Sequence, residues 1–352
     1  MNIKITGSGS YIPTKVVTNL DFAKHHFLNE DGSDFPYPND VVAEKFLEIT
    51  GIQERRYVTE DLTTSDIATF AAEKAIQDAQ IDPETLDYII LAHNFGNVKQ
   101  GAIQSDILPS LASRVKQNLK IKNPSCVAYD VLFGCPGWVE GVIQAQAFIK
   151  AGMAKKCLVI GAETLSRVVD IHDRDSMIYS DGAGATIIEA TEETGGILSH
   201  ESATYAYDEA DYLFFGNSYN TSHDPDVRYI KMFGRKIYEF ALSNVPKAMA
   251  SCLEKSGISI HNVKKVLIHQ ANEKMDEAII QRFFRLYKQT PPEGVMPMSI
   301  HKLGNSSVAT VPTLYDLLIK GKIENQELQK GDVILFASVG AGMNINAFVY
   351  QM

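Results

Sequence analysis

The sequence is poor in cysteine. Its 352 residues include four, Cys126, Cys135, Cys157 and Cys252, scattered without the paired spacing of a zinc site. Such a distribution excludes a disulfide-stapled secreted fold. We therefore expect no metal and predict a reduced, cytoplasmic protein.

The sequence also lacks an excess of basic residues and long apolar runs. It has 33 Lys and Arg against 43 Asp and Glu, a formal net charge of −10, which argues against a nucleic-acid partner because phosphate binding needs a basic face. No apolar run reaches the ~18 residues of a membrane span. The opening MNIKITGSGSYIP lacks a charged segment followed by an apolar one, so we expect neither a signal peptide nor membrane attachment.

What remains is an ordinary globular composition, with 45% hydrophobic and 22% charged residues. The length predicts one large or two medium domains with a sizeable core. Residues 75–94 and 252–272 look alike. Each is read as an amphipathic helix, a polar turn and a buried strand closed by a histidine. These histidines, His93 and His269, lie 176 residues apart, half the length of the chain.

A second pair of segments follows in the same order. Cys135 precedes a helical pattern that reaches Lys150, and Asn305 precedes one that reaches Lys320; an apolar strand follows each. Alternating helices and continuous apolar strands predict an α/β fold with strands buried on both faces. The matching landmarks predict a duplication, with one half over residues 1–170 and the other over 171–352.

Cys135 stands immediately before Pro136, and proline favours the first position of a helix. The sequence therefore predicts Cys135 at a helix N-cap, where unpaired N–H groups and the helix dipole would stabilise its thiolate. Cysteine is more often a small buried hydrophobe. We keep that interpretation for the other three cysteines, which lie in apolar stretches.

His269 ends an apolar strand, and Asn305 opens the second helical pattern. Taken alone, the histidine is as readily a surface residue, and the asparagine is a routine N-cap. By the repeat, however, Asn305 takes the place that Cys135 has in the first half. If the halves pack about a pseudo-dyad, Cys135, His269 and Asn305 meet at one site. His93 holds the equivalent strand end, and we do not favour a catalytic role for it.

Several motifs make the chain resemble the β-ketoacyl-acyl-carrier-protein synthase III family of the thiolase superfamily. They are ITGSGSYIP, TGIQERRYV, the Cys135 segment, SDGAGATI at 180–187, HQAN at 269–272, GNSSVATVP at 304–312 and SVGAGMN. The resemblance covers nearly the whole chain. It implies a thiolase-like αβαβα fold and a homodimer.

The resemblance also implies a decarboxylative Claisen condensation in fatty acid or related polyketide biosynthesis. Cys135 would take an acyl group from a thioester. His269 and Asn305 would stabilise the anion formed when a malonyl thioester loses carbon dioxide. The N–H groups of Cys135 and Ala341 would hold the tetrahedral intermediate. The implied substrates are acyl-coenzyme A or acyl-carrier thioesters, with no permanently bound cofactor.

The sequence departs from the family where coenzyme A binds. Lys45 and Ile49 stand where many members have the tryptophan and arginine that sandwich adenine. Arg167 matches a second arginine near the nucleotide, and Arg235 replaces an asparagine of the pantetheine arm, so these two are the candidate coenzyme A residues. Leu108 takes the place of the residue that closes the acyl pocket of the partner subunit.

Lys274, Arg282 and Arg285 follow HQAN at spacings that put them near one another on one helix. They form a candidate patch for an acidic acyl carrier protein, although a merely solvated face is an equal alternative. Three other functions stay open: a specialised ketosynthase that joins two larger acyl pieces, as in dialkylresorcinol or pigment pathways, a non-catalytic subunit of a condensing heterodimer, and a thioesterase. The intact polar triad disfavours the second, and the absence of a carboxylate base disfavours the third.

Overall fold

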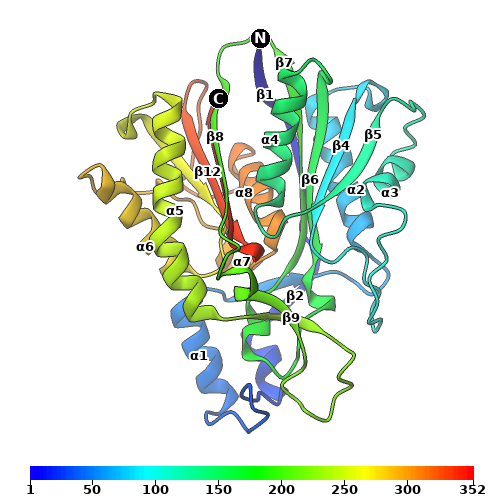
Figure 1. The fold of residues 1–352 in the computed structure, drawn as a ribbon, viewed down its shortest axis with the longest axis vertical. Helices are drawn as coiled ribbons and strands as arrows, with labels where there is room; N and C mark the ends of the chain where they lie inside the picture. Colours follow the sequence, from blue (N-terminus) through cyan, green and yellow to red (C-terminus); the bar gives the residue numbers. More distant parts are fainter.

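A computed structural model describes residues 1–352. Two sheets form its framework (Figure 1). The first has the order β1 (Asn2–Tyr11), β7 (Asp181–Thr191), β6 (Lys156–Thr164), β4 (Tyr88–His93) and β5 (Val127–Leu132). The second has the order β11 (Val263–Ile268), β12 (Val333–Gly340), β13 (Asn344–Gln351) and β8 (Gly196–Thr204). Two small sheets pair β2 (Lys15–Thr18) with β3 (Glu54–Tyr57) and β9 (Leu213–Gly216) with β10 (Tyr229–Met232).

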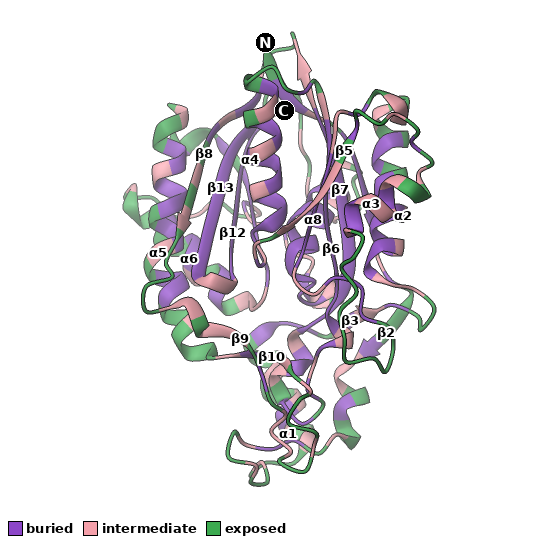
Figure 2. Ribbon diagram, turned by 45° about the vertical axis from the view of Figure 1, so that its right-hand side comes forward, coloured by how far each residue is buried: buried purple, intermediate pink, exposed green.

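Eight α-helices surround and separate the two large sheets. They are α1 (Asn39–Thr50), α2 (Thr64–Ala79), α3 (Leu111–Asn118), α4 (Gly137–Lys150), α5 (Gly234–Ser256), α6 (Glu273–Leu286), α7 (Ile300–Leu303) and α8 (Thr310–Ile319). One apolar cluster joins α4 and α8 to the inner faces of both sheets, around Trp138, Phe336 and Phe348. A second joins α2 and α3 to the outer face of the first sheet, and a third joins α5 and α6 to the outer face of the second. The layers are therefore αβαβα, as expected, and the central strands of both sheets are buried (Figure 2).

The duplication is visible in the strand order. Strands β1, β7, β6 and β4 of the first sheet correspond to β8, β13, β12 and β11 of the second. In each set the first two neighbouring pairs are antiparallel and the last is parallel. The strands read as equivalent from the sequence, β4 and β11, take equivalent places. The first sheet has one further strand, β5, at its edge.

The boundary between the halves lies later than the expected 170/171. Strand β7 pairs with both β1 and β6, so it completes the first sheet, and the second sheet begins with β8. Residues 171–180 lead into β7 through the 3-10 turn Arg174–Ile178. No helix combines the length and the apolar character that crossing a membrane requires.

Helix α1 and the β2–β3 and β9–β10 pairs lie together at one end of the molecule, away from the chain termini (Figure 1). We call this region the cap. It faces the ends of the central strands, near the loops that carry the candidate catalytic residues: Cys135 follows β5, His269 follows β11 and Asn305 follows α7. A site between the cap and these loops is enclosed by elements from both halves.

Candidate active site

A cavity of about 580 Å³ lies between the cap and the ends of the central strands, and 23 of its 35 lining residues are hydrophobic. Cys135, His269 and Asn305 all line it. The chain thus brings together in space the three residues expected to meet. A concave, mostly apolar pocket with a few polar groups is the usual form of a small-molecule site.

Cys135 lies in the loop between β5 and α4. The N-cap of α4 is Pro136 and its first residue is Gly137, so Cys135 is not the predicted N-cap but stands one residue before the cap. The loop packs backbone to backbone on the loop after β12. A Cβ on Gly340 would lie 2.5 Å from the Cys135 nitrogen, and one on Gly134, which has φ +67°, would lie 2.7 Å from the Ala341 nitrogen. Only glycine permits this contact, which places Cys135 beside Ala341 at the cavity wall.

We expected the start of α4 to activate the thiol of Cys135, but this thiol is not activated in the resting protein. Burial raises its pKa to about 11, a hydrogen bond from Ser307 lowers it, and the charge of Glu163 raises it further. Desolvation is the largest of these effects because the charged form loses its contact with water. Cys126, Cys157 and Cys252 are fully buried, and none of them lines the cavity. Cys135 therefore differs from the other cysteines in access.

His269 follows β11 directly, and its backbone N–H donates to the Ala337 carbonyl at 3.0 Å. The side chain is buried, which lowers the pKa of the imidazole to about 4. The ring is thus neutral at physiological pH. Its Nδ1 atom has no hydrogen-bond partner in the chain, and neither nitrogen binds a carboxylate. A neutral imidazole at a cavity wall can donate one hydrogen bond to an oxyanion without first losing a charge.

Asn305 is not a helix N-cap. Helix α8 begins only at Thr310, after a 3-10 turn over Ser307–Ala309. Asn305 instead bridges to the segment that leads into β7: its N–H donates to Ile178 O at 3.0 Å, and its carbonyl accepts from Ser180 N–H at 2.8 Å. Its side-chain Oδ1 accepts the N–H of Ser307 at 2.8 Å. No protein group binds the amide NH₂, which is therefore available to a ligand in the cavity.

Three further polar residues meet at Cys135, and the sequence did not reveal them. The Ser307 hydroxyl donates to the Cys135 sulfur at 3.3 Å, and the Nδ2 of Asn94 donates to the Ser307 oxygen at 3.0 Å. The same Nδ2 donates to Glu163 Oε2 at 2.6 Å. Ser307 lies two residues after Asn305, and Asn94 follows the histidine of the first repeat. These positions close to repeat landmarks were the sequence signal that could have identified the two residues.

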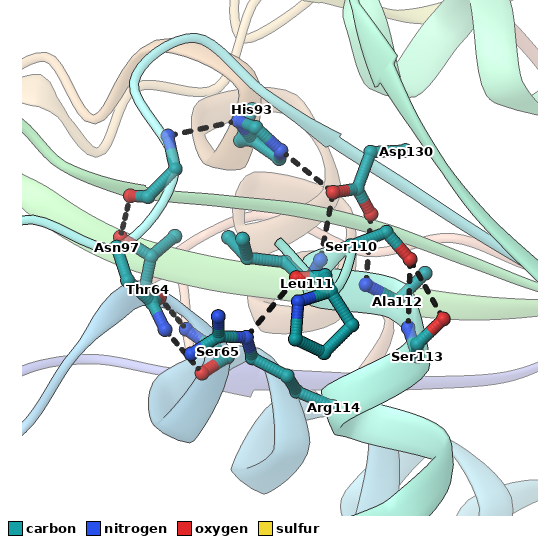
Figure 3. A network of polar contacts seen from close by, with 12 residues as sticks. Thr64, Ser65, His93, Asn97, Ser110, Leu111, Ala112, Ser113, Arg114 and Asp130 are labelled. Atoms are coloured by element: carbon teal, nitrogen blue, oxygen red, sulfur yellow. Dashed lines mark hydrogen bonds and ion pairs between the residues drawn. The ribbon is translucent and has the colours of Figure 1, made fainter. Parts of the chain in front are cut away.

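His93 is absent from the cavity lining. Its Nε2 lies 3.1 Å from Asp130 Oδ2, and its Nδ1 accepts the N–H of Gly96 at 3.0 Å, so the proton is on Nε2 (Figure 3). The two carboxylate oxygens of Asp130 also accept the N–H groups of Leu111 and Ala112 at the start of α3. His93 therefore orders the loop after β4 and helix α3, which agrees with a non-catalytic role.

The expected coenzyme A residues are not brought into the cavity. The Arg167 guanidinium donates to Thr59 O at 2.8 Å, and the exposed Arg235 pairs with Glu239 at 2.9 Å. Gly234, Ile237 and Tyr238 line the cavity, whereas Arg235 does not. Lys45 and Ile49, on α1, do line it. Helix α1 thus contributes to the cavity wall. A contact of Arg167 and Arg235 with coenzyme A stays a prediction.

The candidate carrier patch lies on α6. Lys274, Arg282 and Arg285 are all exposed. Lys274 lies 3.5 Å from Glu48 of α1, and Arg282 Nη1 donates to Leu242 O at 3.0 Å. Lys274 is two residues from Asn272, whose side chain caps α6 and which lines the cavity. Arg282 and Arg285 lie two to three turns further along the helix.

Leu108 does not line the cavity of its own chain, and its side chain is 87% exposed. Its carbonyl accepts from the Arg114 guanidinium at 3.0 Å, which also binds Asp106 and Pro109. Figure 3 shows Arg114 reaching back over the start of α3. The backbone is thus held while the side chain projects outwards.

Comparisons with known proteins agree with this geometry. A family model of 3-oxoacyl-[acyl-carrier-protein (ACP)] synthase III matches residues 129–206, and the model of its C-terminal part matches residues 253–352. The beta-ketoacyl-[acyl-carrier-protein] synthase III of Aquifex aeolicus is 34% identical over 100% of both chains, and that of Oceanobacillus iheyensis is 35% identical over 99% of this chain and 98% of its own. The crystal structure of the Aquifex aeolicus synthase has a TM-score of 0.81 at 31% identity and covers 99% of this chain and 100% of its own.

The fold and the cavity define a ketosynthase-type acyltransferase with a thiolase-like fold. The chain belongs to the beta-ketoacyl-[acyl-carrier-protein] synthase III family. The same fold serves a priming β-ketosynthase of the R1128 polyketide pathway, with a TM-score of 0.82 at 22% identity over 100% of this chain and 96% of the other.

Proposed function

We propose that the chain condenses an acyl thioester with a malonyl-type carrier thioester, with loss of carbon dioxide. One observation carries this proposal: a neutral His269 and the free NH₂ of Asn305 share one apolar cavity with the thiol of Cys135. Two uncharged donors suit a reaction that develops negative charge on an oxygen. The one carboxylate among the lining residues is Asp175, and burial raises its pKa to about 6.

The first half-reaction is acyl transfer. The Cys135 sulfur attacks the carbonyl carbon of the primer thioester, and the tetrahedral intermediate expels the carrier thiolate, which takes up the proton lost by the cysteine. The N–H groups of Cys135 and Ala341 are the proposed donors to the tetrahedral oxyanion, because their loops lie against each other at the cavity wall.

The second half-reaction makes the carbon–carbon bond. The malonyl carboxylate leaves as carbon dioxide, and its bonding electrons form an enolate whose oxygen is stabilised by His269 and Asn305. The enolate carbon attacks the acyl-Cys135 carbonyl, and collapse of the intermediate returns the cysteine thiolate. The product is a β-ketoacyl thioester on the extender carrier.

Intact-mass measurement after mixing with acyl thioesters tests this function. We expect a stable mass increase on Cys135 with the primer alone and release of a β-ketoacyl product when malonyl carrier is added. Rapid hydrolysis of the acyl group would identify a thioesterase. Failure to acquire any acyl group would identify a non-catalytic subunit.

The cap favours a second candidate of the same chemistry, in which both acyl pieces are large. The cavity wall formed by α1 and the segment before it includes Phe35, Tyr37, Phe46 and Ile49 beside Lys45. A largely apolar wall accommodates a second alkyl chain better than an adenine and its phosphates. A long β-ketoacyl carrier tested beside malonyl carrier in the same assay separates the two candidates.

The proposed partners are an acyl carrier protein and a second copy of this chain, in the cytoplasm. Strand β5 is an edge strand of the first sheet, and its Val127 and Leu132 are exposed. An exposed apolar strand edge is normally covered, and antiparallel pairing of two β5 strands would cover it. Sedimentation at equilibrium would show a dimer, and substitution of Val127 by lysine should weaken it.

A further inference from the structure

The hydroxyl of Ser307 is the one side-chain group that hydrogen-bonds the sulfur of Cys135, at 3.3 Å. Ser307 is buried and lines the cavity. It belongs to the second half of the chain, whereas Cys135 belongs to the first. The contact therefore spans the interface between the two halves.

The direction of this hydrogen bond is fixed by its neighbours. The Nδ2 of Asn94 lies 3.0 Å from the Ser307 oxygen and 2.6 Å from Glu163 Oε2. An amide nitrogen only donates, so the serine oxygen accepts from it and the single serine hydrogen is directed to the sulfur. Glu163 Oε2 also accepts the backbone N–H of Asn94 at 2.8 Å. The carboxylate thus fixes which way the Asn94 amide faces.

The backbone of Ser307 gives independent support. Its φ is +52°, in the left-handed region that glycine enters without strain and other residues enter at a cost. The Oδ1 of Asn305 binds the Ser307 N–H, a contact that glycine would make equally well. Backbone geometry alone would therefore favour glycine, and the serine hydroxyl is the group that gains from this position.

We propose that Ser307 is a further catalytic residue of the acyl-transfer step, and that Asn94 and Glu163 are its positioning residues. The Ser307 O–H stabilises the Cys135 thiolate that attacks the primer thioester. It stabilises the same thiolate again when the condensed product leaves. The serine keeps its proton throughout. This inference rests on the proposed role of Cys135.

Two effects of opposite sign act on the thiol. The Ser307 hydrogen bond lowers the pKa of Cys135, whereas the charge of Glu163 raises it. Burial raises the pKa of Glu163 itself to about 7, and the nearby His93 opposes that rise. The titratable groups around this chain of contacts are Glu163 on β6, His93 on β4, His269 after β11 and Tyr179 before β7. Substitutions of Ser307 and Glu163 can separate the two effects, because removing the hydrogen bond and removing the charge move the pH profile of Cys135 alkylation in opposite directions.

The test is the rate of Cys135 alkylation by iodoacetamide as a function of pH, with the labelled peptide mapped at each point. Ser307→Ala should move the profile to higher pH and slow alkylation roughly tenfold below the pKa, the effect of one pKa unit. Ser307→Gly should slow it equally while unfolding at no lower temperature than Ser307→Ala, since glycine suits the positive φ.

Asn94→Ala and Glu163→Gln test the positioning roles. Asn94→Ala should slow alkylation several-fold in the wild-type background and have no effect beside Ser307→Ala, because a positioning residue acts only through the group it positions. Glu163→Gln keeps the acceptor and removes the charge, so it should move the profile to lower pH.

The outcomes distinguish this inference from the function on which it rests. Unchanged profiles in Ser307→Ala and Ser307→Gly would overturn the inference alone, as would equal effects of Asn94→Ala with and without the serine hydroxyl. Labelling of Cys126, Cys157 or Cys252 in place of Cys135 in the wild type would overturn the proposed function as well.

Discussion

The side-chain oxygen of Asn305 accepts the backbone N–H of Ser307 at 2.8 Å. This bond uses the acceptor end of the amide and turns its NH₂ towards the cavity. The same turn sets the Ser307 hydroxyl on the sulfur of Cys135 at 3.3 Å. In the proposed mechanism this short segment would serve both half-reactions, with Asn305 directed at the extender and Ser307 at the nucleophile.

Asn305→Asp keeps the acceptor that holds Ser307 and replaces the donor by an anion. We expect acylation of Cys135 to continue, and malonyl decarboxylation to fall roughly a hundredfold or more, the usual cost of losing one oxyanion donor. Single-turnover acylation and decarboxylation are measured separately. Asn305→Ala is the control, because it also releases Ser307 and should impair both steps. Loss of acylation with intact decarboxylation in Asn305→Asp would reverse the assigned roles.

The lowered pKa of His269 predicts a specific pH dependence. Burial brings this pKa to about 4, so the neutral donor form is complete above about pH 5 and is lost only as the pH falls towards 4. The rate of malonyl decarboxylation should therefore be level between about pH 5 and pH 8. His269→Ala should be slow over the whole range. A transition near the ordinary histidine pKa of about 6.5, present in the wild type and absent in the variant, would contradict a buried neutral imidazole.

The duplicated α/β fold could be predicted from the sequence because its signals are local and occur twice. The strands at His93 and His269 have the same apolar pattern, and they became β4 and β11 of equivalent sheets. The boundary at 170/171 was wrong because β7 joins the first sheet through pairing with β1, a contact between segments far apart in the chain. Strand pairing over such distances leaves no local pattern.

Convergence of Cys135, His269 and Asn305 also followed from the repeat. The pKa of Cys135 did not, because it depends on desolvation in a cavity formed by both halves and the cap. The N-cap predicted at Asn305 failed because a 3-10 turn precedes α8. Glu163 was missed for a third reason: an acid at the end of an apolar strand is indistinguishable from a surface residue until its neighbours are placed around it.

The patch on α6 predicts salt-sensitive use of an acyl carrier protein. Lys274 is exposed, and it is two residues from Asn272, which lines the cavity. Glu48 lies 3.5 Å from Lys274 at the surface, and such an exposed ion pair competes only weakly with a carrier protein for the lysine. Lys274→Glu should raise the KM for malonyl carrier severalfold and leave kcat nearly unchanged, because long-range charge acts on encounter. Raising the salt concentration should have the same effect on the wild type. The matched control is Lys247→Glu, an equal charge change on α5. Equal effects of the two variants would remove the patch from the docking site.

Leu108 determines primer length if it closes the acyl cavity of a second subunit. Its side chain is 87% exposed in the single chain, while Arg114 holds its carbonyl at 3.0 Å, so the leucine projects from an ordered backbone. The family resemblance implies that a phenylalanine at this place selects acetyl-sized primers. Leucine is smaller, and the cavity is about 580 Å³ and mostly apolar. Each further buried methylene of a primer would contribute about 0.8 kcal/mol, which favours longer chains roughly fourfold per carbon.

We therefore expect acyl-Cys135 formation to be faster with medium or branched primers than with acetyl, and Leu108→Phe to shift the optimum to shorter chains. A primer series from two to ten carbons, offered on coenzyme A and on carrier protein, measures this. Leu108→Ile is the control, since it keeps the volume and should keep the optimum. The largely apolar cavity wall contributed by α1 predicts that carrier-bound primers react better than the same acyl groups on coenzyme A. An optimum at acetyl-coenzyme A in the wild type would instead assign the chain to initiation with the smallest primer, and the length of the cavity would then serve the extender.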